Sequence, residues 1–173
     1  MKPNNIMLAG VLGLGLVSAA HAVDGKLAIT GLVTDTACVV TGAGTDIPVS
    51  LGTVNRAAFT ADGAPVANLG FDIAVTNCAQ NSAVVVRFNG TQLPGSAGLI
   101  QLNPITDSAT GVAIGLYEES GAPIPLNTNS LPQQTDGTGA ALLKYTAAYV
   151  APSAAAVVSG NVSATADFTI INP

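Results

Sequence analysis

The sequence contains no tryptophan, one histidine and two cysteines among its 173 residues, and only 9% of the residues are charged. The histidine, His21, lies in a segment with the pattern of an export signal, so the rest of the chain has none. A chain without histidine cannot form a Ser–His or Cys–His catalytic pair. The absence of tryptophan also removes the strongest aromatic platform for stacking a sugar ring.

Other catalytic groups are equally sparse. Glu118 and Glu119 are adjacent, so in a strand they would point to opposite faces and could not act as a carboxylate pair. There is no C-x-x-C motif for a metal and no glycine-rich phosphate loop between a strand and a helix. The isolated aspartates are expected to solvate the surface or cap turns: Asp35, Asp46, Asp62, Asp72 and Asp107. The sequence therefore predicts no enzyme, no cofactor and no metal site.

Charge and hydropathy narrow the possible partners. Residues 23–173 contain four scattered basic residues and ten acidic ones, which gives a net charge of −6. The sequence therefore has no basic patch that would predict a nucleic-acid partner. Apolar residues make up 49% of the chain, which predicts that part of the surface faces another subunit. Simple alanine enrichment is the alternative, because alanine raises the apolar fraction while covering little area.

The N-terminus has the features of a secretory signal. Lys2 precedes an apolar run over residues 6–17, and Ala20-His21-Ala22 has the small-x-small pattern of a cleavage site. The run is short for a membrane span, so we expect residues 1–22 to be a cleaved signal peptide, with a buried N-terminal helix as the alternative. Residues 23–173 then form one domain of 151 residues, with no later apolar run of span length.

Export places the two cysteines, Cys38 and Cys78, in an oxidising compartment. We therefore expect a Cys38–Cys78 disulfide, unless the bond is intermolecular. A loop of this length would stabilise the fold by about 4 kcal/mol in the chain-entropy model.

Short strands separated by turns account for the rest of the chain. Pro48 suggests an edge or a bulge, Asn89-Gly90 predicts a turn, and residues 127–139 predict a loop. Seven to nine strands over this length indicate an all-β, immunoglobulin-like sandwich. The segments from which these strands are drawn, some of them brief, are residues 27–33, 38–40, 46–54, 71–77, 83–88, 98–102, 111–118, 124–126, 141–150 and 160–171.

The two terminal strands are of special interest. Residues 27–33 alternate, with Leu27, Ile29, Gly31 and Val33 on one face. This segment could be the first strand of the chain's own sheet or a strand lent to a neighbouring molecule. The pattern alone slightly favours the first interpretation.

Several motifs occur in an order and spacing that resemble a known family. They are the 25–31 segment followed by Thr34-Asp35-Thr36-Ala37-Cys38, then Val49-Ser50-Leu51-Gly52-Thr53-Val54, Gly70-Phe71-Asp72-Ile73 with Asn77-Cys78, Val86-Arg87-Phe88-Asn89-Gly90, Gly111-Val112-Ala113-Ile114-Gly115-Leu116-Tyr117, Tyr145-Thr146-Ala147-Ala148-Tyr149, and the tail over 164–170. Together they resemble the pilin subunits of chaperone–usher fimbriae, in particular type 1 major subunits.

The resemblance implies an incomplete immunoglobulin-like sandwich that lacks its last strand. A donor strand from a neighbouring subunit, here residues 23–33 with Leu27, Ile29, Gly31 and Val33, would complete the domain formed by residues 34–173. It also implies three kinds of partner that the subunit meets one after another: a periplasmic chaperone, an outer-membrane usher, and then identical or related pilin subunits. Gly160, Phe168 and Ile170 would belong to the chaperone-contacting strand at the edge of the groove.

The implied function is a structural subunit of a pilus rod on the bacterial surface, exported through the periplasm and supporting cell adhesion. Any contact with a host glycan would be made by a separate tip adhesin, because 151 residues leave no room for an additional lectin domain. A minor or adaptor pilin and a self-contained, secreted sugar-binding sandwich are the alternatives. The sequence departs from the family at Asn172, where a tyrosine is typical.

Overall fold

The computed structural model describes residues 37–41 and 46–172, and this part of the chain is almost entirely β-structure. Two short 3₁₀ turns, Arg56–Ala58 and Ala154–Ala156, are its helical elements. The strands are β1 (Val39–Thr41), β2 (Pro65–Thr76), β3 (Ala83–Gly90), β4 (Ala113–Glu118), β5 (Gln133–Gln134), β6 (Ala141–Val150) and β7 (Ala166–Ile171). The all-β class predicted from the sequence is confirmed.

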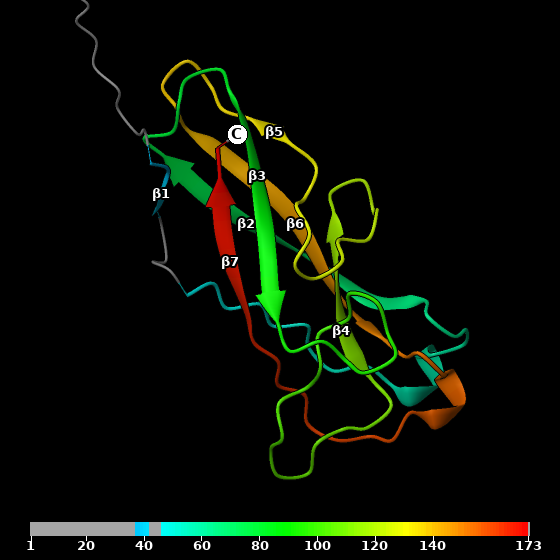
Figure 1. The fold of residues 1–173 in the computed structure, drawn as a ribbon. Helices are drawn as coiled ribbons and strands as arrows, with labels where there is room; N and C mark the ends of the chain where they lie inside the picture. Colours follow the sequence, from blue (N-terminus) through cyan, green and yellow to red (C-terminus); the bar gives the residue numbers. More distant parts are fainter. Residues whose placement is uncertain (1–36, 42–45, 173) are drawn as a thin grey trace, which may run out of the picture. The chain divides into compact units, whose positions relative to one another are not determined.

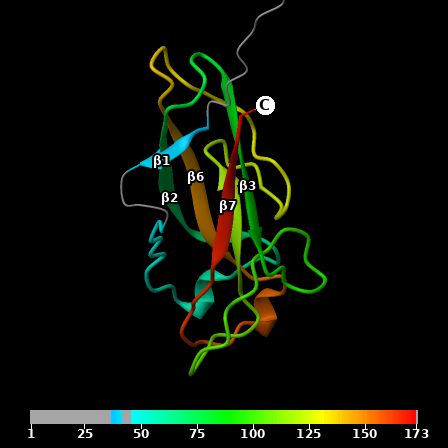
Figure 2. The same ribbon diagram turned by 60° about the vertical axis from the view of Figure 1, so that its left-hand side comes forward.

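The strands form two antiparallel sheets, as Figures 1 and 2 show. One sheet has the order β1-β2-β6-β4, and the other has the order β5-β3-β7. Antiparallel sheets commonly bury one face and leave the other in solvent, and the alternating patterns of β2 and β6 fit that arrangement.

The core lies between the two sheets. Ile73 of β2, Leu143 of β6 and Val86 of β3 are fully buried. Phe88 of β3 lies edge-on to Tyr145 of β6, with 5.1 Å between ring centroids, so aromatic packing joins one sheet to the other. Such rings bury large apolar areas, and the sheets therefore hold together mainly through side chains rather than backbone bonds.

A disulfide joins Cys38 to Cys78, as predicted. It connects the residue before β1 to a residue just after β2, where Val39 pairs with Thr76. β1 has only three residues, so the covalent bond holds at the sheet edge a strand that few backbone bonds retain.

Sequence periodicity located the long strands well. The predicted strand at 141–150 coincides with β6, and those at 71–77, 83–88 and 111–118 correspond to β2, β3 and β4. The short strands were less accurately predicted. Residues 98–102 and 124–126 are not strands, because the bridges there are isolated: Ile100 pairs with Gln92 and with Ile114, and Pro123, just before the second segment, pairs with Tyr117.

Two turn and loop predictions were wrong in detail. Asn89-Gly90 does not turn but continues β3, because these residues pair with Asp167 and Ala166 of β7. The predicted loop at 127–139 contains the two-residue strand β5, which pairs with Ala83 and Val84. In both places a partner strand outweighed the local turn preference.

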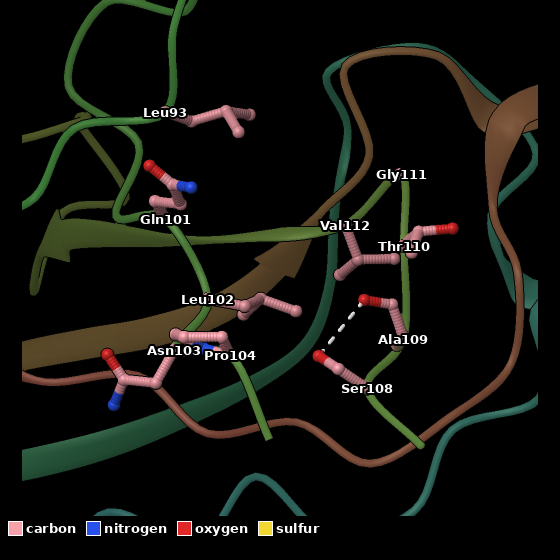
Figure 3. Close-up of a pocket in the computed structure, with 10 residues that line it drawn as sticks. All are labelled: Leu93, Gln101, Leu102, Asn103, Pro104, Ser108, Ala109, Thr110, Gly111 and Val112. Carbon is pink, nitrogen blue, oxygen red and sulfur yellow. Dashed lines mark hydrogen bonds between the residues drawn. The ribbon is translucent and has the colours of Figure 1, made fainter. Parts of the chain in front are cut away.

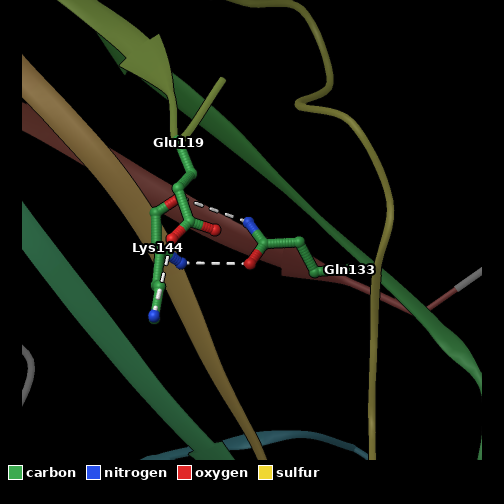
Figure 4. A network of polar contacts seen from close by, with 3 residues as sticks. All are labelled: Glu119, Gln133 and Lys144. Atoms are coloured by element: carbon green, nitrogen blue, oxygen red, sulfur yellow. Dashed lines mark hydrogen bonds and ion pairs between the residues drawn. The ribbon is translucent and has the colours of Figure 1, made fainter. Parts of the chain in front are cut away.

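A side chain takes the place of a strand at one edge of the sandwich (Figure 4). The amide nitrogen of Gln133 donates to the backbone oxygen of Lys144 (3.4 Å), and the Lys144 N–H donates to Gln133 Oε1 (3.0 Å). Lys144 lies in β6 beyond the residues that pair with β4. Since Gln133 belongs to the other sheet, this pair of bonds ties the two sheets together. The exposed Lys144–Glu119 ion pair (3.5 Å) alongside it adds little.

Glu118 is the one acidic residue buried in the described part of the chain, with 6% of its surface exposed. Its Oε1 accepts a hydrogen bond from the Leu131 N–H (2.6 Å), which fixes the segment before β5 against the end of β4. Burial raises the pKa of the Glu118 carboxyl, and the bond from Leu131 partly opposes that rise. The folded state therefore binds this proton more tightly than the unfolded chain does.

We expect Glu118→Gln to become progressively more favourable as the pH rises. Because the folded pKa is raised, the cost of the buried charge is absent below the unfolded pKa and fully present above the folded pKa. Chemical denaturation at several pH values from about 4 to 7 should show the stability of the variant, relative to the parent, increasing with pH. A relative stability that falls with pH would mean that the bond to Leu131 outweighs burial.

Candidate functional site

β7 lies at the end of its sheet. It pairs with β3 in antiparallel register, from Val85↔Ile171 to Gly90↔Ala166, and the structure describes no strand on its other side. In an antiparallel strand about half of the backbone N–H and C=O groups point away from a given neighbour. The outer edge of β7 therefore presents a row of backbone groups without a ladder partner within residues 37–41 and 46–172, and such an edge readily pairs with another chain.

Burial differs sharply between β7 and its partner. Phe88 and Val86 of β3 are 3% and 0% exposed, respectively. Their opposite residues in β7, Phe168 and Ile170, are only half-buried, although their side chains pack against the same core. The core is thus covered over β3 and remains partly uncovered over β7.

The sequence-predicted strand at 46–54 has no strand partner. Ile47, Val49 and Leu51 are half-buried, whereas Asp46, Pro48 and Ser50 are exposed, which is the alternation of an extended chain. None of the backbone hydrogen bonds described for the structure involves these nine residues. The prediction of a strand was therefore wrong, because the segment is extended without pairing, and Pro48 could not donate in any case.

These two segments both contribute half-buried apolar side chains to the same core, and we call this set of side chains the open stripe. In Figure 2 residues 46–54 lie on the side of β7 that faces away from β3, and in Figure 1 they run past the lower end of β7. A hydrogen bond from Tyr149 Oη to the Gly52 carbonyl (2.9 Å) ties that segment to β6. The open stripe consists of Ile47, Val49, Leu51 and Val54 on one flank and Ala166, Phe168 and Ile170 on the other, all packed against the core.

A hollow of about 260 Å³ lies near the start of β7 (Figure 3). Leu93, Leu102 and Val112 contribute apolar side chains to it, and Gln101 and Ser108 contribute polar ones. Asn103 connects this region to the segment that leads into β7, because its amide nitrogen lies 3.3 Å from Ser163 Oγ and 3.1 Å from Thr165 Oγ1. The far end of β7 is tied as well, through Ser82 Oγ, which donates to Asn172 Oδ1 (3.1 Å).

Of the site residues predicted from the sequence, two lie in β7 and one lies outside it. Phe168 and Ile170 lie on the inward face of β7, where they pack against the core, and their role at the edge of a groove stays a prediction. Gly160 lies outside β7, because the predicted strand at 160–171 begins only at Ala166. Bridges from Val158 to Thr110 and from Asn161 to Ser108 hold the preceding residues away from the β3 ladder.

The remaining site predictions concern residues outside the described ranges. Leu27, Ile29, Gly31 and Val33 lie there, as does the proposed signal peptide, so their roles stay predictions. Sequence reasoning missed the flank formed by Ile47, Val49, Leu51 and Val54 as a binding surface. The alternation of Ile47, Val49 and Leu51 around Pro48 was the available signal.

Within residues 37–41 and 46–172, no group of three or more His, Cys, Asp or Glu side chains is placed to bind a metal ion. Across the same part of the chain, no helix has the length and hydropathy needed to cross a membrane.

Comparisons with known proteins show which family the chain belongs to. The family model described as "Fimbrial protein" matches residues 27–171. The chain belongs to this fimbrial family. The Salmonella typhimurium "Long polar fimbria protein A" is 34% identical over 88% of this chain and 85% of its own, and the "Fimbria A protein" of Serratia marcescens is 34% identical over 98% of each.

Solved structures show the same fold. The P pilus rod subunit PapA has a TM-score of 0.64 at 23% identity, covering 79% of this chain and 99% of its own. A type I fimbria protein of Burkholderia pseudomallei has a TM-score of 0.59 at 30% identity, covering 80% and 90%. The chain is a structural subunit of a cell-surface fimbria, with an incomplete immunoglobulin-like sandwich.

We expect Gly160→Ala to destabilise the domain by about 2 kcal/mol or more, because an added Cβ would meet backbone atoms of Asp107, Ser108 and Ala109. Gly137→Ala is the matched control, since a Cβ there meets nothing within 4 Å. Urea denaturation of both variants checks this expectation. Equal midpoints would show that the 107–109 loop can move aside.

Proposed function

We propose that this subunit polymerises into a pilus rod by donor-strand exchange. Residues 23–33 of one subunit would add to the open stripe of another, along the free edge of β7. The observation that carries this proposal is the half-burial of Phe168 and Ile170 opposite the fully covered Phe88 and Val86.

Strand addition would satisfy the unpaired backbone groups of β7 and would also cover its exposed apolar side chains. The backbone of the incoming strand supplies hydrogen-bond partners to the outer edge of β7. Its alternate side chains, Leu27, Ile29 and Val33, would cover the half-buried residues of the open stripe, while Gly31 would lie where the stripe is shallow. Each fully buried aliphatic side chain contributes roughly 1.5–3 kcal/mol before ordering costs.

The contact is head-to-tail, because the donor segment and the acceptor edge are different parts of the same chain. Such an interface does not close on itself, and it generates a filament of identical or related subunits. A monomer with an exposed sheet edge is prone to aggregate. A periplasmic chaperone would therefore cover β7 once residues 1–22 have been cleaved, and it would do so until the subunit reaches an outer-membrane usher.

A rod subunit and an adaptor subunit would use the same edge, so their abundance separates them. We assign the rod role because two relatives whose names describe major fimbrial subunits match this chain along more than nine-tenths of their own length. Quantitative mass spectrometry of isolated fimbriae would support this assignment if the chain is the dominant component. An adaptor would be present in only a few copies per fibre.

The polymerisation mechanism is tested by complementation. A domain lacking residues 1–33, with Cys38–Cys78 oxidised, should melt about 10 °C or more higher when a synthetic peptide of residues 23–33 is bound, because three anchors become buried. The same peptide carrying Ile29→Asp should give no rise, because a carboxylate would enter the apolar stripe.

Acceptor variants provide the matched control. Ile170→Ala removes an inward side chain and should weaken the peptide effect, whereas Thr169→Ala changes an exposed neighbour and should not. A domain whose melting ignores the parent peptide would contradict strand donation. Equal losses for Ile170→Ala and Thr169→Ala would show that the peptide binds elsewhere.

A further inference from the structure

A second hollow, of about 230 Å³, lies on the other sheet, away from β7. It is bordered by Tyr117 at the end of β4, Glu119 and Ser120 in the turn that follows, Thr146 of β6 and Asn68 of β2. Ile114 and Leu116 of β4 face the core, as does Val112 just before it, so Tyr117 belongs to the outer face of its sheet.

The shape of this hollow follows from the sheet register. Tyr117 pairs with Thr146, and Thr146 pairs with Gly70 on its other side. Along this row of paired residues the side chains therefore become smaller, from the Tyr117 ring to Thr146 and then to Gly70, which has no side chain. The difference in size leaves a shallow step beside the ring. The ring also lies over Gly115, because a Cβ built there would come within 2.8 Å of the Tyr117 hydroxyl.

An irregularity in β2 brings Asn68 to this step. The register with β6 shifts between Val66 and Leu69, so β2 bulges at this point. Ala67 within the bulge has φ = 55°, a left-handed conformation that is strained for alanine. Strained residues persist where the surrounding structure imposes them, and they are concentrated at functional sites.

The polar groups around the ring are free to bind. In the described part of the chain, the side chains of Asn68, Ser120 and Thr146 and the Tyr117 hydroxyl make no hydrogen bond of their own, and Glu119 contacts only Lys144. One aromatic face with several small donors and acceptors suits a ligand that has an apolar face and many hydroxyls. The nearby carboxylate and the negative charge of the chain disfavour an anionic ligand.

We propose that this hollow, which we call the Tyr117 hollow, binds a neutral hexopyranoside, one residue of a glycan. The aromatic ring stacks on the C–H face of the sugar, and Asn68, Glu119, Ser120 and Thr146 bond its hydroxyls. A shallow site of this kind binds weakly, with Kd of the order of millimolar. If the subunit polymerises as proposed above, the repeated sites in a fibre would bind a glycan-coated surface with high avidity.

The test uses saturation-transfer NMR to measure binding of small glycosides to the secreted protein. The protein is used in the form that its cells produce, whether fibre or free subunit. The probes are the methyl glycosides of mannose, galactose and N-acetylglucosamine, with glucuronate as the anionic comparison, each at about 20 mM. We expect saturation of at least one neutral glycoside and a weaker effect on glucuronate. Because the measurement does not require polymerisation, a failure to form fibres would not affect it.

Variants locate the binding. Glu119→Gln with Asn68→Ala should lower the signal at least about fivefold, and Tyr117→Leu should abolish it, because the stacking face is lost. Tyr117→Phe keeps a ring over Gly115 and should retain part of the signal, which separates stacking from misfolding. Ser159→Ala, exposed and outside the hollow, is the control and should leave the signal unchanged.

The proposal would be overturned by no saturation of any neutral glycoside, by equal saturation in the parent and in Tyr117→Leu, or by stronger saturation of glucuronate. A signal that is lost equally in Tyr117→Leu and Ser159→Ala would also overturn it, since binding would then not depend on the Tyr117 hollow.

Discussion

The mismatch between a covered β3 and a partly uncovered β7 is the constraint on which the function of this domain depends. A sandwich gains its stability by burying the inner faces of both sheets. Here the inner face continues into β7, where Phe168 and Ile170 pack against the core without being enclosed. The backbone edge and the apolar side chains of the same strand are left open together, so one extended segment can satisfy both.

A domain with an open stripe needs other means to stay ordered, and it uses local polar ties and one covalent bond. The Cys38–Cys78 disulfide retains the three-residue strand β1, and Gln133 joins the two sheets through the backbone of Lys144. Asp136 Oδ1 accepts from the N–H groups of Thr138 (2.8 Å) and Ala140 (2.9 Å), which closes the turn before β6. None of these bonds involves a residue of β7, so none of them occupies its outer edge.

The sequence predicted the parts of this fold that depend on periodicity. The alternation in 71–77 and 141–150 identified β2 and β6, because each has one face against the core. Periodicity could not show that 46–54 lacks a partner, since an unpaired extended segment and a paired strand bury the same alternate residues. Nor could it reveal the open stripe: Val86 and Ile170 are both β-branched aliphatic residues, and only their pairing shows that one is covered and the other is not.

The position of the Tyr117 hollow bears on how binding and assembly could coexist in one small domain. The open stripe borders β7, whereas the hollow lies on the outer face of the sheet β1-β2-β6-β4. A strand added at β7 extends the other sheet along its own edge, so it would leave Tyr117, Thr146 and Asn68 uncovered. Two weak features that would be ineffective in a monomer, a shallow hollow and an unpaired edge, therefore support each other: strand addition multiplies the copies, and the copies raise the avidity of the hollow.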